Sequence, residues 1–209
     1  MILNTLFSNP LIFLIWMIAI LIPITVHEFA HGFTAYLLGD PTAKNMGRLT
    51  FNPIAHIDFV GFLLLLLVGF GWGKPVPYNP YNLRNKRWGP LMVSLSGPLS
   101  NLILIVIFGL LLKGLSFLGT ENYLILLLVA IVQINIILMI FNLLPIPPLD
   151  GSSIVFSLLP ARFDNFKISF QRSGYMILIF LIIFDSLFKI GILTTIFGFF
   201  SDLIFKVIG

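Results

Sequence analysis

Long apolar stretches separated by short polar segments dominate the chain, and they predict helices that cross a membrane. Leu11–Leu38 contains no Lys, Arg or Asp, while Leu91–Leu112 and Asn122–Leu149 contain no charged residue at all. A helix needs about 20 apolar residues to cross the hydrocarbon core of a bilayer. The pattern therefore predicts three transmembrane helices in these ranges.

A shorter apolar run, Phe59–Phe70, lies between the first two spans. About 12 residues at about 1.5 Å each reach only about 18 Å as a helix, which is less than the thickness of the core. We therefore expect this run to enter the membrane and return to the same side as a re-entrant segment.

Two apolar runs near the end of the chain, Ser173–Phe184 and Ile190–Ser201, are separated by Asp185 and Lys189. These two charges are four residues apart and could pair on the face of one continuous helix. They could also mark the turn between two helices, with Gly191 directly after it. We favour the second interpretation, a C-terminal helical hairpin.

Composition agrees with a polytopic membrane protein. Of the 209 residues, 58% are hydrophobic and only 10% are charged, whereas soluble proteins average about 25% charged residues. A soluble core of this length could not bury so much apolar surface, which excludes an ordinary cytosolic enzyme. The absence of cysteine excludes disulfides and thiolate catalysis. No basic run contains interleaved aromatic residues, so we expect no nucleic-acid partner.

The basic residues predict the orientation of the chain in the membrane. Only Lys113 and Lys189 are expected on one side, and the other side is therefore predicted to be cytoplasmic. The ten residues expected there are Lys44, Arg48, Lys74, Arg84, Lys86, Arg87, Arg162, Lys167, Arg172 and Lys206. We expect an integral multi-pass protein of the cell (plasma) membrane, in contact with the lipid bilayer.

The sequence has no internal repeat or linker, so we expect one transmembrane domain over residues 1–209. Its core covers about 11–151, and its C-terminal helices cover about 173–208. The first ten residues contain no Lys or Arg and no evident cleavage site. We therefore expect the N-terminus to belong to the mature protein and not to a signal peptide.

A cluster of ionisable residues interrupts the first span. His27, Glu28 and His31 follow the pattern H-E-x-x-H and include two of the three histidines in the chain. Ionisable groups are costly inside a span and mark function there. Residues four apart share one helix face, so both imidazoles can bind one Zn²⁺. Glu28 points about 100° away, beside the open coordination position, where it can accept a proton from water.

A catalytic zinc keeps three protein ligands, and Asp150 is the best candidate for the third. Three prolines precede it and must end the helix of the third span; they are Pro145, Pro147 and Pro148. Because the first and third spans both end on the predicted cytoplasmic side, Asp150 and the histidine pair are expected at similar depth.

Several polar residues have two interpretations each. Asp150 could instead cap the next helix, in which case Asp58 or His56 is the fallback ligand. Asn101 could hydrogen-bond the catalytic region or contact substrate, although packing against a neighbouring helix is favoured. Asn142 could donate to an oxyanion or make a structural hydrogen bond.

Taken together, these residues resemble the site-2 protease family of intramembrane zinc metalloproteases, in a compact branch without PDZ or CBS domains. The resemblance rests on HEFAH at 27–31, GPLSN at 97–101 and NLLPIPPLDG at 142–151. It also includes GRLTFNPIAHID at 47–58 and GWGKPVP at 71–77.

The resemblance implies an activity and assigns roles to residues. His27, His31 and Asp150 would bind one Zn²⁺, and Glu28 would be the catalytic acid and base. The substrate would be a transmembrane segment of another membrane protein, cut in regulated intramembrane proteolysis.

The resemblance also implies an all-α fold with a three-helix transmembrane catalytic core and a site inside the membrane, toward the cytosol. Members of this family commonly have short membrane-associated strands after the HExxH helix. Residues 44–50 and 59–70 are the stretches that could form them.

Two other functions are compatible with such a site. A metal transporter would use these residues in transit, but transporters often place such sites at the midplane between repeats. A non-catalytic metal-binding protein would close its site with a fourth ligand, for which His56 is the candidate. The complete H-E-x-x-H pattern favours a peptidase, because a structural site has no need of Glu28.

Overall fold

The computed structural model of the protein describes residues 2–208, and in this range it is built from helices. No strand is formed among these residues, where one antiparallel bridge joins Ile57 and Gly73. The all-α prediction is confirmed. The helices are α1 (Ile2–Ser8), α2 (Pro10–Leu37), α3 (Thr42–Asn45), α4 (Phe59–Val68), α5 (Gly89–Gly114), α6 (Tyr123–Leu143), α7 (Asp150–Leu158), α8 (Asp164–Phe188) and α9 (Ile192–Ile208).

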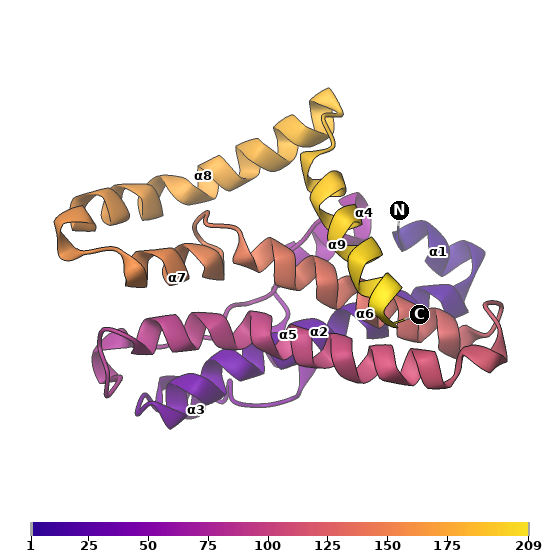
Figure 1. Ribbon diagram of the computed structural model, residues 1–209, viewed down its shortest axis with the longest axis horizontal. Helices are drawn as coiled ribbons and strands as arrows, with labels where there is room; N and C mark the ends of the chain where they lie inside the picture. Colours follow the sequence, from indigo (N-terminus) through magenta and orange to yellow (C-terminus); the bar gives the residue numbers. More distant parts are fainter. Residues whose placement is uncertain (1, 209) are drawn as a thin grey trace.

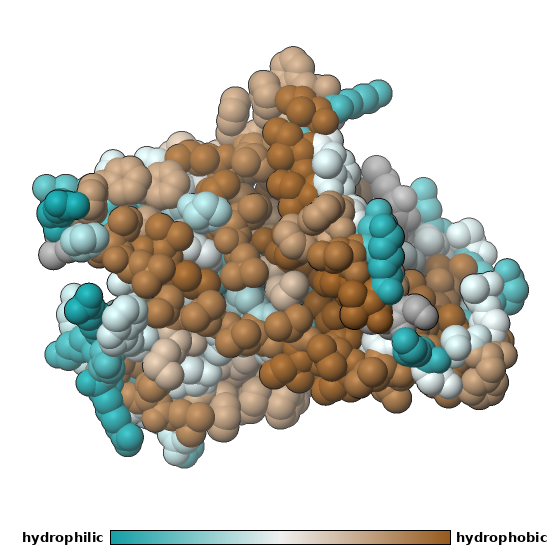
Figure 2. Space-filling view, viewed as in Figure 1, coloured by the Kyte–Doolittle hydropathy of each residue, from teal (hydrophilic) through white to brown (hydrophobic). Residues whose placement is uncertain are grey.

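Helices α2, α5 and α6 pack together as the core (Figure 1). Each is long and apolar enough to cross a membrane, and within residues 2–208 the stretch 164–185 of α8 is a fourth such helix. Ala19 of α2 and Ala130 of α6 are buried between these helices with Ile15 and Ile131. Small residues at these positions let the helix axes approach closely. Apolar side chains also cover much of the outer surface (Figure 2), which suits a protein surrounded by lipid.

The short apolar run forms a helix after which the chain turns back, as expected of a re-entrant segment. Helix α4 packs beside α1 and ends at Gly69, which adopts a left-handed conformation with φ of 86°. The chain then returns, because Ile57 and Gly73 pair across the two legs of the segment. The amide of Lys74 also donates a hydrogen bond of 2.8 Å to the carbonyl of His56. The residues just before α4 and those just after its return therefore lie side by side.

The short strands expected at 44–50 and 59–70 are not formed in the described part of the chain. The second stretch is helical because its run of consecutive leucines has high helix propensity and lacks the alternation of a half-buried strand. The first contains the end of α3 followed by turns. These expectations came from the resemblance, and for this chain they are wrong.

The turn predicted near the end of the chain is present, and the alternative of one continuous helix is wrong. Lys189 and Gly191 both have positive φ, which reverses the chain between α8 and α9. The carboxylate of Asp185 accepts hydrogen bonds from the amides of Ile192 and Leu193 at 2.7 and 3.3 Å, at the start of α9. Helix α8 begins earlier than expected, at Asp164.

Helix α9 packs on α6 and α5 and diverges from α8 (Figure 1). Phe197 contacts Phe141 with ring centroids 6.5 Å apart, and Ser201 accepts a 3.1 Å hydrogen bond from Gln133. Helix α9 therefore runs antiparallel to α6. Its C-terminal end points away from the end of the molecule that holds the start of α5 and its basic residues. The expected position of Lys206 on the basic side is wrong, because the apolar face of α9 packs along the core helices.

Candidate metal centre

Three of the predicted site residues converge on one point. The Nε2 atoms of His27 and His31 are 3.0 Å apart, and each lies 3.2 Å from Oδ2 of Asp150. The histidines come from one face of α2, and Asp150 comes from the first turn of α7. The N-cap of α7 is Leu149, without a side-chain cap bond, so the carboxylate of Asp150 faces the histidines instead of capping the helix.

A chain of side-chain hydrogen bonds fixes the tautomer of His27. Asn135 donates from Nδ2 to the carbonyl of Ile131 at 2.8 Å, so its Oδ1 accepts from Asn101 at 2.9 Å. This arrangement turns Oδ1 of Asn101 toward Nδ1 of His27, at 2.7 Å. Because an amide oxygen only accepts, Nδ1 of His27 carries the proton and Nε2 presents a lone pair. Asn101 and Asn135 are completely buried, so this chain is shielded from water.

His31 is fixed in the same tautomer by a backbone group. Its Nδ1 lies 2.7 Å from the carbonyl oxygen of Val93 on α5, which can only accept. Both Nε2 atoms therefore turn lone pairs toward Oδ2 of Asp150, a buried oxygen without a hydrogen-bond donor. Three acceptor atoms face one another without a proton between them, an arrangement that a cation stabilises.

The donor set fits a four-coordinate divalent metal ion. Ligands about 2.0–2.1 Å from a tetrahedral ion lie about 3.3 Å apart, close to the separations observed here. Two imidazoles and one carboxylate also suit zinc among the common metals. His27, His31 and Asp150 form the one group of this kind within residues 2–208. A fourth protein ligand, which a closed structural site would require, is not among them.

Glu28 lies beside this group and is held by a segment far away in the sequence. Its Oε2 accepts a 2.8 Å hydrogen bond from the amide of Val76. Arg48 supports the same segment, because its guanidinium donates to the carbonyls of Lys74 and Pro75 at 2.6 and 3.3 Å. The returning leg of the re-entrant segment therefore borders the carboxylate that the sequence analysis assigned to acid–base chemistry.

Asp40 anchors the continuation of this segment to the end of α2. It is fully buried, and its carboxylate accepts hydrogen bonds from Thr42, the Asn79 amide and the Asn82 side chain. Burial alone raises the pKa of Asp40, but these donors outweigh burial and lower it below its ordinary value. Nearby, burial and the negative charge of Asp150 both raise the pKa of Tyr78, so its phenol stays protonated.

The proline-rich segment that carries Asp150 is held from two sides. A Cβ atom at Gly151 would collide with the carbonyls of Leu143 and Leu144 at the end of α6. A Cβ atom at Gly174 of α8 would lie 2.7 Å from the carbonyl oxygen of Pro147. Close packing at both glycines therefore sets where α7 begins, and with it the position of Asp150.

Changing Gly174 to Val is expected to weaken this packing. The new side chain must displace Pro147 or α8, and overpacking of this kind typically costs about 1–3 kcal/mol. We expect a lower unfolding temperature and weaker metal binding, measured by thermal unfolding and by competition with a chelator. Gly198→Val in α9 is the control, because nothing lies within 4 Å of a Cβ there. Equal behaviour of the two variants would contradict this packing.

The other predicted site residues lie outside the metal group. His56 is fully buried, and its Nε2 lies 2.8 Å from the carbonyl of Thr50. Asp58 caps α4 by accepting from the Gly61 amide at 2.9 Å. Asn142 donates from Nδ2 to the carbonyl of Leu138, one turn earlier, at 2.9 Å. The structure therefore gives none of these three side chains a place among the converging atoms.

Asn101 meets both of its main interpretations. Its Nδ2 donates to Asn135 on the neighbouring helix α6, its Oδ1 contacts His27, and it cannot reach substrate because it is completely buried. Val93, Val76 and Asn135 were not predicted from the sequence to belong to the site. The first two act through backbone atoms and leave no side-chain signal, whereas Asn135 is one of the few polar residues in an apolar span.

Replacing Asn101 with Leu is expected to weaken metal binding about 10- to 100-fold, as is typical when the partner of a ligating histidine is removed. The substitution leaves the Nδ1 proton of His27 buried without an acceptor. Competition with a chelator measures the affinity. Gln133→Leu, which removes another polar contact between helices, is the control and should leave the affinity unchanged. Wild-type affinity in Asn101→Leu would show that this hydrogen bond does not tune the site.

Fold and site together define a polytopic membrane protein with a candidate metal centre of two histidines from a spanning helix and one aspartate. Comparison with known proteins identifies its family. Residues 118–184, which include Asp150, match the model of peptidase family M50. The chain is 40% identical over 178 residues to a Bacillus subtilis protein named "Putative zinc metalloprotease YwhC", covering 80% of this chain and 78% of that protein. The chain belongs to peptidase family M50.

A more distant relative is "Putative zinc metalloprotease Rip2" of Mycolicibacterium smegmatis, 27% identical over 184 residues, with 80% of this chain and 66% of that protein covered. The protein of the same name from Mycobacterium tuberculosis is 30% identical over 149 residues, and this chain spans 52% of its length. No solved structure matches the chain significantly.

Proposed function

We propose that the protein is a zinc-dependent intramembrane endopeptidase that cuts a transmembrane segment of another membrane protein, as in regulated intramembrane proteolysis. One observation carries the proposal. Two imidazole nitrogens from a spanning helix and a carboxylate oxygen from α7 face one another within 3.2 Å, with Glu28 beside them. Membership of family M50 and the names of the relatives support a metalloprotease.

Each residue has a defined task in this proposal. His27, His31 and Asp150 would hold zinc, which supplies Lewis acidity, polarising the scissile carbonyl and lowering the pKa of water. Glu28 accepts the proton of the attacking water and then donates it to the leaving amine. The Val76 amide holds the carboxylate of Glu28 in place for both transfers.

The presence of an apolar cavity beside the site supports the proposal that the substrate is a membrane-embedded segment. It has a volume of about 810 Å³ and lies between α2, α4, α6 and the C-terminal helices. Leu21, Ile24 and Thr25 line it, and they lie one to two turns before Glu28 on the same face of α2. A helical substrate hides its carbonyls in internal hydrogen bonds, so it must unwind before it can be cut. Residues that weaken a helix should therefore favour cleavage.

We also propose that the protein lies in the plasma membrane with its site toward the cytosol. The end of α2, the start of α5 and the turn between α7 and α8 lie at one end of the molecule (Figure 1). Nine of the twelve basic residues belong to the connection between α2 and α5 or to residues 162–172 around the start of α8, which supports a cytoplasmic location by the positive-inside rule.

Hydrolysis of a transmembrane peptide tests the proposal. Purified protein is incubated in detergent with a peptide that contains an Asn-Pro pair in its apolar segment, and products are identified by mass spectrometry. We expect products from the zinc-loaded protein, none after removal of zinc by a chelator, and recovery when zinc is restored. A zinc-loaded protein that cuts none of several such peptides would contradict the proposal.

A further inference from the structure

A second cavity, of about 610 Å³, lies between the start of α5 and the α7–α8 turn. Its charged lining consists of three cations, Lys86, Arg87 and Lys167, and one carboxylate, Asp164. The charge of Lys167 is already paired, because its Nζ donates to Asp164 at 2.8 Å and to the carbonyl of Leu159 at 3.0 Å. Lys86 and Arg87 are exposed and form no ion pair within residues 2–208. This basic pocket therefore has an excess of positive charge.

The basic pocket lies next to the metal centre along two helices. Ser153 and Ser157 line it, and they follow Asp150 by one and two turns on one face of α7. On α5, Pro90 lines the pocket one turn before Val93, whose carbonyl holds a histidine of the metal centre. Helices α5 and α7 pack against each other, so a peptide that extends from the metal centre along the surface of these two helices reaches the basic pocket.

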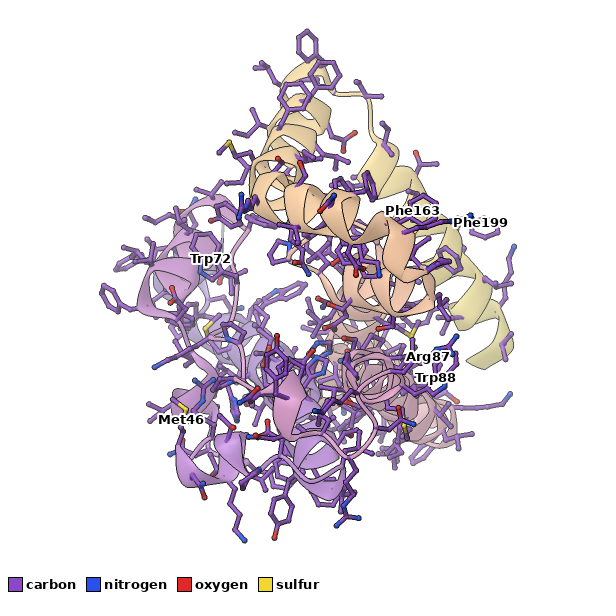
Figure 3. All side chains as sticks on the ribbon, turned by 90° about the vertical axis from the view of Figure 1, so that its left-hand side faces the viewer. Met46, Trp72, Arg87, Trp88, Phe163 and Phe199 are labelled. Atoms are coloured by element: carbon purple, nitrogen blue, oxygen red, sulfur yellow. The ribbon has the colours of Figure 1, made fainter. Side chains whose placement is uncertain are left out.

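A third wall of the pocket comes from the segment that borders Glu28. Tyr78 lines the pocket and lies two residues after Val76, whose amide is bonded to Glu28. Figure 3 views this end of the molecule, with Arg87 and Trp88 at the start of α5 and Phe163 just before α8. Hydrophilic side chains gather at the same end (Figure 2). The pocket thus lies on the polar side of the metal centre, and the apolar cavity lies on its membrane side.

We propose that the basic pocket is a specificity subsite that receives an acidic segment of the substrate, next to the scissile bond on its cytosolic side. This inference rests on the proposed function. Transmembrane segments are usually flanked by Lys and Arg on the cytosolic side, and Lys86 and Arg87 repel such flanks. The site therefore rejects ordinary membrane proteins and accepts those whose cytosolic flank carries Asp or Glu.

The position of the pocket favours a peptide over an anionic lipid headgroup. Three of its walls are formed by segments that hold the metal centre and Glu28, and the fourth is the start of α8, so its occupant lies within a few residues of the bond to be cut. Pairing between exposed charges is modest for each pair. Two cations acting on two or three carboxylates should nevertheless change kcat/KM about tenfold.

Three peptides that differ only in the cytosolic flank test the inference. They share one apolar segment and end in three Glu, three Gln or three Lys residues, and they are cut in vesicles of phosphatidylcholine, which carries no net charge. We expect kcat/KM to be about tenfold higher for the Glu flank than for the Lys flank. In the double variant Lys86→Glu, Arg87→Glu the preference should reverse, with unchanged zinc content and unchanged cleavage of the Gln peptide.

The double variant Arg84→Glu, Arg162→Glu is the matched control, because it changes the net charge equally with residues outside the pocket lining. It should keep the wild-type preference. Cleavage of all three peptides at equal rates would overturn the inference and leave the proposed function intact. A preference that appears only with anionic phosphatidylglycerol, or that both double variants lose, would also overturn it. Cleavage of none of the peptides would contradict the proposed function itself.

Discussion

Replacing Glu28 with Gln is expected to stop hydrolysis while zinc stays bound. The proposed ligand atoms belong to His27, His31 and Asp150, so the substitution leaves them in place. The amide oxygen of Gln can still accept the hydrogen bond from Val76, but the side chain can no longer take a proton from water. Removing a general base typically lowers the rate about 10²- to 10⁴-fold.

Zinc content and cleavage rate should be measured on the same samples of Glu28→Gln. Glu121→Gln is the natural control, because Glu121 is the other glutamate of the chain and lies exposed in the loop before α6. We expect one zinc per chain in both variants, and cleavage by Glu121→Gln alone. Wild-type cleavage by Glu28→Gln would remove Glu28 from the mechanism, and loss of zinc would make it a ligand.

The second large effect is expected from Gly97→Ala. A Cβ atom at this position of α5 would lie 2.6 Å from Cε1 of His27 and would also collide with Nε2 of His31. Contacts this short cannot persist, so at least one imidazole must turn away from the converging atoms. Because both rings are fixed from behind by Asn101 and Val93, turning them also breaks those hydrogen bonds.

We therefore expect zinc content to fall from one per chain to near zero in Gly97→Ala, and cleavage to fall with it. Replacing Gly with Ala strengthens an isolated helix, so loss of zinc could not be attributed to a weaker α5. Gly114→Ala, at the end of the same helix, has no atom within 4 Å of the new Cβ and serves as the control. Full zinc content in Gly97→Ala, measured by elemental analysis, would contradict the geometry of the site.

The hydrophobic pattern was sufficient to predict the three core helices and the re-entrant run. Both predictions depend on length and charge, which the bilayer constrains strongly. The packing of α9 could not be predicted in this way. Its apolar face could contact either lipid or the helices α6 and α5. Only tertiary contacts, such as the hydrogen bond between Gln133 and Ser201, show that it packs on the helices.

The metal group was predictable because the spacing of its residues in the sequence indicates which side chains lie together. His27 and His31 share a helix face, and the prolines before Asp150 place that residue at the end of a span. The surrounding hydrogen bonds were not predictable to the same degree. The acceptor for His31 is a backbone carbonyl, and the role of Asn101 depends on which helix faces α5, information that appears only when the three helices are packed together.

Intramembrane cleavage is tested most directly by the position of the cut in a substrate held in a bilayer. An oriented single-span peptide is incorporated with the protein into phosphatidylcholine vesicles, and the masses of the products locate the scissile bond. We expect a cut inside the apolar segment, near its cytosolic end. Cuts confined to the flanks outside the bilayer would instead mean that the protein is a membrane-anchored peptidase of soluble segments.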